Sequence, residues 1–202
     1  MRKLFFWALP IIVALTVSSC AKSTPSKYET VEGDQLQTQI YTLDNGLKVY
    51  MTVNKETPRI QTYIAVRVGS KNDPHETTGL AHYLEHLMFK GTEQFGTSDY
   101  AAEKPLLDSI RALFEVYRTK TDPAERLALY HRIDSFSYEA SKIAIPNEYD
   151  KLMSVIGADG TNAFTSNDMT VYTDEIPSNE IDNWAKIQSD RFMHPVIRGF
   201  HT

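Results

Sequence analysis

Two histidines and a glutamate stand close together in the run His82-Tyr83-Leu84-Glu85-His86. Imidazole nitrogens can bind a divalent metal, and a carboxylate can accept a proton from water. On a helix with His82 at 0°, His86 falls at about 40° and Glu85 at about 300°. The three side chains therefore share one arc of about 100°, and we expect them to face one site.

The opposite side of the same helix is apolar, with Leu80, Leu84, Leu87 and Met88 between about 140° and 240°. A histidine and glutamate face is destabilising when it is buried without partners, but it suits a bound metal. Histidines on an ordinary surface, or satisfied within a core, are the alternative interpretation. The shared arc argues against both.

This spacing is the H-x-x-E-H pattern, the inverted counterpart of the H-E-x-x-H zinc proteases. Histidines at positions i and i+4 can converge on one Zn²⁺, so we predict His82 and His86 as metal ligands, with one zinc per site. A catalytic zinc needs a third protein ligand and one open position for water. We predict Glu85 as the general base that accepts a proton from that water.

Strand and turn patterns surround the predicted metal helix. Residues 37–43 and 47–53 are strand-like and flank Asn45-Gly46, a strong hairpin signal. Residues 60–68 alternate and predict a third strand, and 69–78 form a polar loop. We expect the helix over 79–90, with Gly91 as its C-cap.

The second half is helical first and mixed afterwards. Helices are predicted over 101–117 (kinked or started at Pro105), 124–144, 147–156 and 178–193 (with Ser178 as N-cap), and strands over 161–165 and 170–176. The first two helices predict a hairpin laid on the domain, as a packing element or as a substrate contact. The fold class is α+β, a mostly antiparallel sheet with helices packed on one side and an inserted helical hairpin at about 100–156.

The first twenty residues differ from the rest. Arg2 and Lys3 precede an apolar run, and small residues precede Cys20, the single cysteine of the chain. This order predicts a lipoprotein signal peptide over 1–20 with lipidation of Cys20, or alternatively a simple secretory signal. Residues 21–36 are expected to be a flexible tether and 37–202 the peptidase domain. We expect a bacterial envelope protein, lipid-anchored on the periplasmic side of the outer membrane.

The composition of the chain argues against a disordered protein and against a nucleic-acid-binding protein. Hydrophobic residues make up 42% and charged residues 23% of the chain, which argues against wholesale disorder. The formal net charge is −5 and no basic block is present, so nucleic acid is not an expected partner.

Residues 79–92, GLAHYLEHLMFKGT, resemble the signature of the pitrilysin–insulysin family of metallopeptidases. Residues 160–166, GTNAFTS, followed by 170–172, resemble that family's substrate-side strand. The resemblance runs from about Tyr41 to the C-terminus, except for the helical stretch from about 100 to 156. It implies zinc on His82 and His86 with Glu85 as base.

The resemblance also implies that Asn162, Ala163 and Phe164 pair with an extended peptide, by addition of a strand to a sheet edge. An ordinary sheet strand is the alternative. Hydrolysis of extended peptides or unfolded segments by a zinc endopeptidase is therefore the expected function. A non-catalytic scaffold or partner subunit of the same fold, and an envelope lipoprotein whose helical hairpin binds another protein, are the alternatives.

The family's third zinc ligand is a glutamate on a later helix, and no residue of this chain matches it. We expect that ligand beyond residue 202, and also a second similar half or subunit that closes a chamber around the peptide. The chain then corresponds to an incomplete first domain of a larger metallopeptidase and should be inactive, or nearly so, by itself.

Overall fold

The computed structural model describes residues 28–199. The chain forms two compact units that meet between Glu56 and Thr57. Cys20, and with it the predicted signal peptide, lies outside the described residues. None of the helices within 28–199 has the length and hydrophobicity that a membrane span requires.

The first unit contains the predicted β-hairpin, which is confirmed. Strand β1 (Gln39–Thr42) pairs antiparallel with β2 (Lys48–Met51). In the turn, Gly46 has a φ of +85°, a conformation that glycine adopts without a steric penalty. Glu29, in the predicted tether, exchanges two backbone hydrogen bonds of 2.8 and 2.9 Å with Ile40 of β1.

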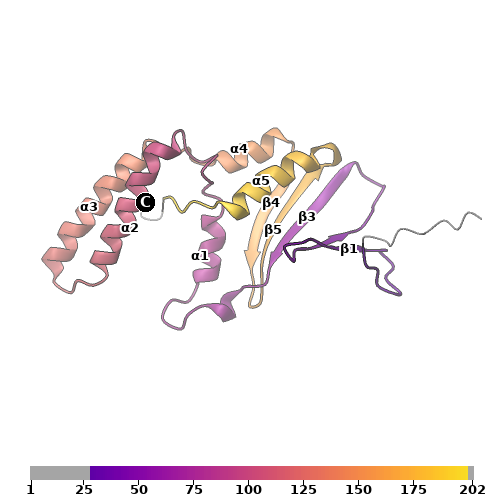
Figure 1. Ribbon diagram of the computed structural model, residues 1–202, viewed down its shortest axis with the longest axis horizontal. Helices are drawn as coiled ribbons and strands as arrows, with labels where there is room; N and C mark the ends of the chain where they lie inside the picture. The colour runs from indigo at the N-terminus through magenta and orange to yellow at the C-terminus, as the bar shows by residue number, and fades with distance from the viewer. Residues whose placement is uncertain (1–27, 200–202) are drawn as a thin grey trace, which may run out of the picture. The chain divides into compact units, whose positions relative to one another are not determined.

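The second unit is built on a three-stranded antiparallel sheet in the order β3-β5-β4 (Figure 1). Its strands are β3 (Arg59–Val66), β4 (Asp159–Thr165) and β5 (Thr170–Pro177). The central strand β5 is the most buried, because it has a neighbour on each side. The α+β class and the antiparallel sheet are therefore confirmed.

Five α-helices and two short 3₁₀ turns complete the described part of this unit, residues 57–199. They are α1 (Leu80–Leu87), α2 (Tyr100–Tyr117), α3 (Pro123–Ser141), α4 (Glu148–Val155) and α5 (Ile181–Met193), with η1 (Ser70–Asn72) and η2 (Ser178–Glu180). Helices α4 and α5 pack on the sheet around Tyr149, Met153 and Ile176, and Trp184 of α5 joins that cluster. Helix α1 lies next to β4.

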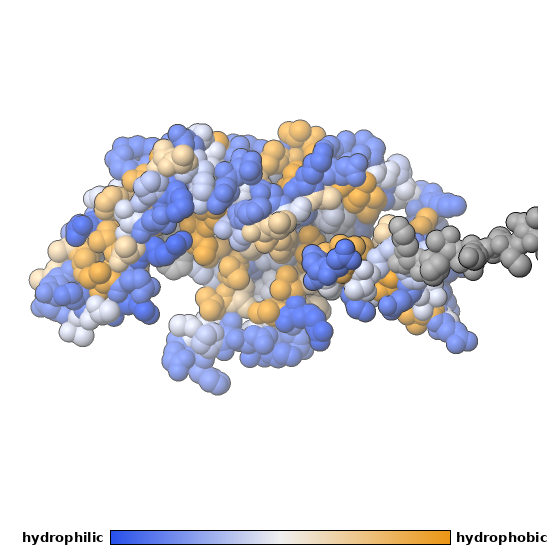
Figure 2. Space-filling view, in the orientation of Figure 1, coloured by the Kyte–Doolittle hydropathy of each residue, from blue (hydrophilic) through white to orange (hydrophobic). Residues whose placement is uncertain are grey.

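Helices α2 and α3 form the predicted helical hairpin and have a core of their own. Ile110, Leu113, Ile133 and Ala140 are its buried members. The hairpin projects away from the sheet beyond α1 (Figure 1). Apolar side chains also reach its surface between charged ones (Figure 2), among them Val116, Leu127, Tyr130 and Tyr138. The hairpin is thus packed mainly against itself, and not laid flat on the domain.

Two predicted helix boundaries are wrong, and so is the alternative start of the helix over 101–117 at Pro105. Helix α5 begins at Ile181, because the N–H of Ser178 donates to Pro58 O at 3.0 Å and holds Ser178 at the end of the sheet, so Ser178 is not its N-cap. Helix α1 ends at Leu87, before Gly91. Pro105 lies inside α2, which starts at Tyr100 with Asp99 as N-cap.

Candidate metal centre

The N-terminus of α1 is fixed by an aspartate in the preceding loop. Asp73 accepts hydrogen bonds from the N–H groups of Gly79, at 2.7 Å, and Ala81, at 2.8 Å. These N–H groups have no partner inside the helix, so a carboxylate there stabilises both the helix end and its dipole. Gly79 is left-handed, with a φ of +88°, which lets the chain turn sharply into α1.

The two histidines of α1 are exposed and point at the same place. Their Nε2 atoms lie 3.2 Å apart. Two nitrogens bound to one tetrahedral zinc at about 2.05 Å would be about 3.3 Å apart, so the observed separation fits two ligands of one ion. Without a metal the same separation fits an N–H···N hydrogen bond between neutral rings. The side-chain geometry of His82 and His86 therefore matches the predicted ligand pair.

Glu85 lies on the inner side of α1, unlike the two histidines. It is 5% exposed, and its Oε2 accepts a hydrogen bond of 2.5 Å from the hydroxyl of Thr165 at the end of β4. A buried carboxylate without a partner is destabilising, so this hydrogen bond stabilises the side chain of Glu85 in its buried position. The helix thus presents two exposed imidazoles and, one residue before the second, a buried and oriented carboxylate.

The apolar back of α1 is only partly covered. Leu87 and Met88 are buried, whereas Leu80 and Leu84 are 49% and 48% exposed. Buried Ala81, Glu85 and Met88 follow each other at helical spacing, so the packed stripe runs along the Glu85 side.

Within residues 28–199, no group of three metal-binding side chains comes together. The last two glutamates of the sequence have other partners. Glu175 accepts from Arg59 Nε at 2.5 Å, and Glu180 accepts from Asn183 at 2.7 Å. His82 and His86 are the two candidate ligands that the described residues supply.

The C-terminus of α1 is held by a buried arginine from α5. Arg191 is 1% exposed, and its Nε donates to Met88 O at 3.0 Å. Its guanidinium carbon lies 4.3–5.6 Å from the ring centroids of four aromatic residues, Phe89, Tyr149, Tyr172 and Phe192. Cation–π contacts of this kind compensate a charge that has lost its water.

The same burial shifts two proton affinities. Burial lowers the pKa of Arg191, although the neighbouring tyrosines oppose the shift. Burial also raises the pKa of Tyr149 to about 12, and the Arg191 charge acts in the opposite direction. The Tyr149 hydroxyl accepts from Arg191 Nη1 at 2.8 Å and from Gln188 at 2.9 Å. Both groups thus belong to one hydrogen-bonded cluster behind the metal helix.

The predicted substrate strand is an edge strand. Strand β4 pairs with β5 on one side, and no other strand of the described sheet pairs with it. Asn162 and Phe164 are exposed, and Ala163 is half-buried. The Ala163 N–H donates to Oδ1 of the Asn162 side chain at 2.9 Å. A carbonyl group of an added peptide strand would accept from the Ala163 N–H in place of the Asn162 side chain.

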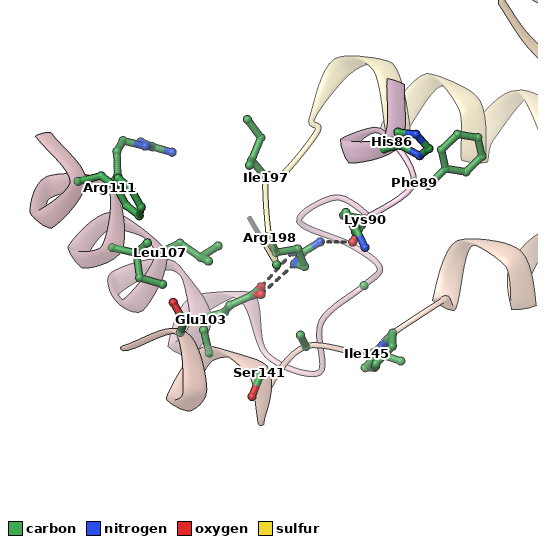
Figure 3. Close-up of a pocket in the computed structure, with 18 of the residues that line it drawn as sticks. His86, Phe89, Lys90, Glu103, Leu107, Arg111, Ser141, Ile145, Ile197 and Arg198 are labelled. Atoms are coloured by element: carbon green, nitrogen blue, oxygen red, sulfur yellow. Dashed lines mark hydrogen bonds and ion pairs between the residues drawn. The ribbon is translucent and has the colours of Figure 1, made fainter. Parts of the chain in front are cut away.

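A cavity of about 740 Å³ reaches from His86 to the helical hairpin (Figure 3). Leu107 of α2 and Ile197 of the C-terminal stretch contribute apolar walls. Arg198 and Glu103 form a buried ion pair beside it, with Nε–Oε1 at 2.9 Å and Nη2–Oε2 at 3.0 Å. The hairpin therefore both packs on itself and lines the space next to one candidate ligand.

Known proteins resemble this chain in sequence and in fold. Residues 48–105 match the model of the insulinase family, peptidase family M16. Protease 3 of Escherichia coli K12 is 30% identical over 162 residues, which are 77% of this chain and 15% of that protein. Sequence and fold relate this chain to the M16 metallopeptidases.

Two solved structures have a similar fold. The crystal structure of pitrilysin matches 85% of this chain and 13% of that chain, with a TM-score of 0.51 and 19% identity. The first half of the periplasmic protease PqqL from Escherichia coli matches 83% of this chain and 27% of that chain, with a TM-score of 0.52 and 18% identity. The α+β fold corresponds to part of the first M16 domain, and this chain spans a small part of each relative's length.

Sequence patterns did not reveal that Thr165 and Arg191 contact the segment that carries the candidate metal ligands. Thr165 contacts Glu85 across 80 positions, and Arg191 contacts Met88 across 103. Asp73, eight positions before Ala81, was also missed. The sequence holds one local signal for this capping role of Asp73, namely that Pro74 follows it and that Gly79 precedes the helix.

Proposed function

We propose that α1 and β4 form part of the active site of a zinc endopeptidase of the M16 type. The observation that carries the proposal is the convergence of His82 and His86, 3.2 Å apart at Nε2, next to the buried carboxylate of Glu85. In this proposal His82 and His86 hold the zinc through Nε2. The third protein ligand comes from outside residues 28–199.

Each side chain has a distinct task in the proposed reaction. Zinc, when bound, lowers the pKa of a coordinated water towards about 7. Glu85 accepts a proton from the attacking water, and Oε1 is the available oxygen because Oε2 accepts from Thr165. Glu85 then returns the proton to the amine that leaves. Burial keeps bulk water away from this carboxylate and fixes its direction.

The proposed substrate is an extended peptide or an unfolded segment. Support comes from the free edge of β4 next to α1, where exposed Asn162 and Phe164 flank Ala163. Backbone hydrogen bonds along a sheet edge select extended chains with little demand on side chains. Asn162 would swing aside and leave the Ala163 N–H for a substrate carbonyl.

We further propose that a second similar half or subunit closes the site, and that lipid on Cys20 anchors the protein in the bacterial cell envelope. The relative PqqL is described as a periplasmic protease. Labelling with a radioactive fatty acid tests the anchor, since wild type should incorporate label and Cys20→Ser should not. Label that persists in Cys20→Ser would contradict it.

The enzymatic proposal is tested on the natural full-length polypeptide by zinc analysis and peptide hydrolysis. Glu85→Gln should keep about one zinc per chain and lose activity by at least about 100-fold. His86→Ala should lose both zinc and activity. Exposed residues of the loop before α1 provide matched controls, His75→Ala and Glu76→Gln, which should resemble wild type.

Two results would contradict the proposal. Activity that survives Glu85→Gln would exclude this residue as the base. Zinc binding without any hydrolysis by the wild-type polypeptide would favour the alternative, a non-catalytic subunit of the same fold.

A further inference from the structure

Thr165 contacts the candidate general base directly. Its hydroxyl donates to Glu85 Oε2 at 2.5 Å, and within residues 28–199 it is the one hydrogen-bond donor to this carboxylate. We propose that Thr165 is a positioning residue of the hydrolytic reaction, which fixes the carboxylate so that its other oxygen faces the attacking water. This inference rests on the proposed function, because it assigns a task relative to Glu85 as base.

The position of the Thr165 hydroxyl is determined by its neighbours in the sheet. Thr165 is paired with Thr170 in the β4–β5 register, and their hydroxyl oxygens lie 3.2 Å apart. Thr170 donates to Val68 O at 3.0 Å. A threonine side chain has few rotamers on a strand, so these contacts leave the Thr165 hydroxyl one direction, towards α1.

The loop before α1 clamps the same corner of the sheet. Ser70 N donates to Ser166 O at 2.9 Å, and Lys71 N donates to Asn167 O at 3.1 Å. A Cβ on Gly69 would lie only 2.3 Å from Ser166 O, so the backbones approach as closely as glycine permits. Asp73 of this loop also holds the start of α1. The segment that follows Thr165 and the start of α1 are therefore held by the same loop.

Thr165 also belongs to the strand that we propose as the substrate strand. Thr165 follows immediately after Asn162, Ala163 and Phe164, the proposed peptide-pairing residues. The strand that would align the peptide also holds the base by its last residue. Loss of the hydroxyl should therefore reduce kcat and leave KM nearly unchanged, because the backbone of the strand stays in place.

The test compares variants of the natural full-length polypeptide. Thr165→Val keeps the shape but removes the donor, and kcat should fall about 10- to 100-fold, with KM within about 3-fold and zinc content unchanged. Thr165→Ser keeps the donor and should retain kcat within about 3-fold. Thr42→Val, at the exposed last residue of β1, is the matched control and should leave both constants unchanged.

Wild-type kcat in Thr165→Val would overturn the inference, and so would equal damage in Thr165→Ser. If Thr165→Val does not fold, Thr165→Ala is measured in its place. Misfolding of both would also overturn the inference, because the residue would then be structural. Glu85→Gln is measured in parallel. Full activity of that variant rejects the proposed function itself, whereas its inactivity beside an active Thr165→Val rejects only the role of Thr165.

Discussion

The buried pair of Glu103 and Arg198 provides a sharp test of how the helical hairpin is attached. Glu103 is 0% and Arg198 4% exposed, and two hydrogen bonds join them. Arg198 also donates to the carbonyl groups of Lys90, Thr92 and Phe95, at 3.1, 2.7 and 3.3 Å. One guanidinium thus links α2 to the loop that follows the metal helix.

Glu103→Gln is the cleanest perturbation, because it keeps the shape and removes the charge. Removal of one partner of a buried ion pair lowers the free energy of unfolding by about 3–5 kcal/mol. The amide oxygen of Gln can still accept a hydrogen bond from Arg198, so we expect a loss at the lower end, about 3 kcal/mol. A fall of about 3 kcal/mol with a urea slope of about 2 kcal/mol/M moves the midpoint by about 1.5 M.

Urea unfolding followed by tryptophan fluorescence measures this change, since Trp184 packs in the sheet cluster. Asp108→Asn on the same helix removes the acid of an exposed pair with Lys104 and is the matched control. Its midpoint should move far less, because solvent screens exposed ion pairs. If the urea midpoint moves no further in Glu103→Gln than in Asp108→Asn, burial of the Glu103–Arg198 pair does not strengthen its contribution to stability.

Further stability predictions concern the residues around α1. Since burial raises the pKa of Tyr149 to about 12, the folded state holds its proton more tightly than the unfolded state, and the free energy of unfolding should fall by about 2 kcal/mol as pH rises from about 10 to about 12. Tyr149→Phe should remove this part of the pH dependence in urea titrations. A fall of equal size in Tyr149→Phe would show that another group is responsible. Asp73→Ala should lower stability by about 1–2 kcal/mol in the same titrations and Asp73→Asn by less, because a capping acceptor remains; equal losses would count against the cap. Gly69→Ala should lower the thermal midpoint, because the new Cβ would meet Ser166 O at 2.3 Å. An unchanged midpoint would show that the loop yields easily.

Local patterns predicted the parts of this structure that depend on neighbours in sequence. The Asn45-Gly46 turn, the helical hairpin and the metal helix each follow from a repeat or a turn signal within a few residues. The helix arc also placed His82 and His86 on one side, and their Nε2 atoms do converge. The arc did not show that Glu85 is buried while both histidines are exposed.

Contacts between distant segments could not be predicted in this way. Serine is a common N-cap residue, but the hydrogen bond from the Ser178 N–H to Pro58 O at the end of the sheet determines the conformation of Ser178. Arg191 looks like an ordinary polar residue of an amphipathic helix, yet it is buried among four aromatic rings from three other parts of the fold and its own helix. Glu103 resembles a surface acid until Arg198 is brought beside it. These features arise from tertiary packing, which local propensity does not contain.

The central claim is that His82 and His86 bind one zinc ion together. The most direct measurement is the zinc content of the natural full-length polypeptide by elemental analysis, for wild type, Glu85→Gln, His82→Ala and His86→Ala, after dialysis against a weak chelator. We expect about one zinc per chain in the first two proteins and almost none in either histidine variant. Zinc retained at the wild-type level in both histidine variants would contradict this claim.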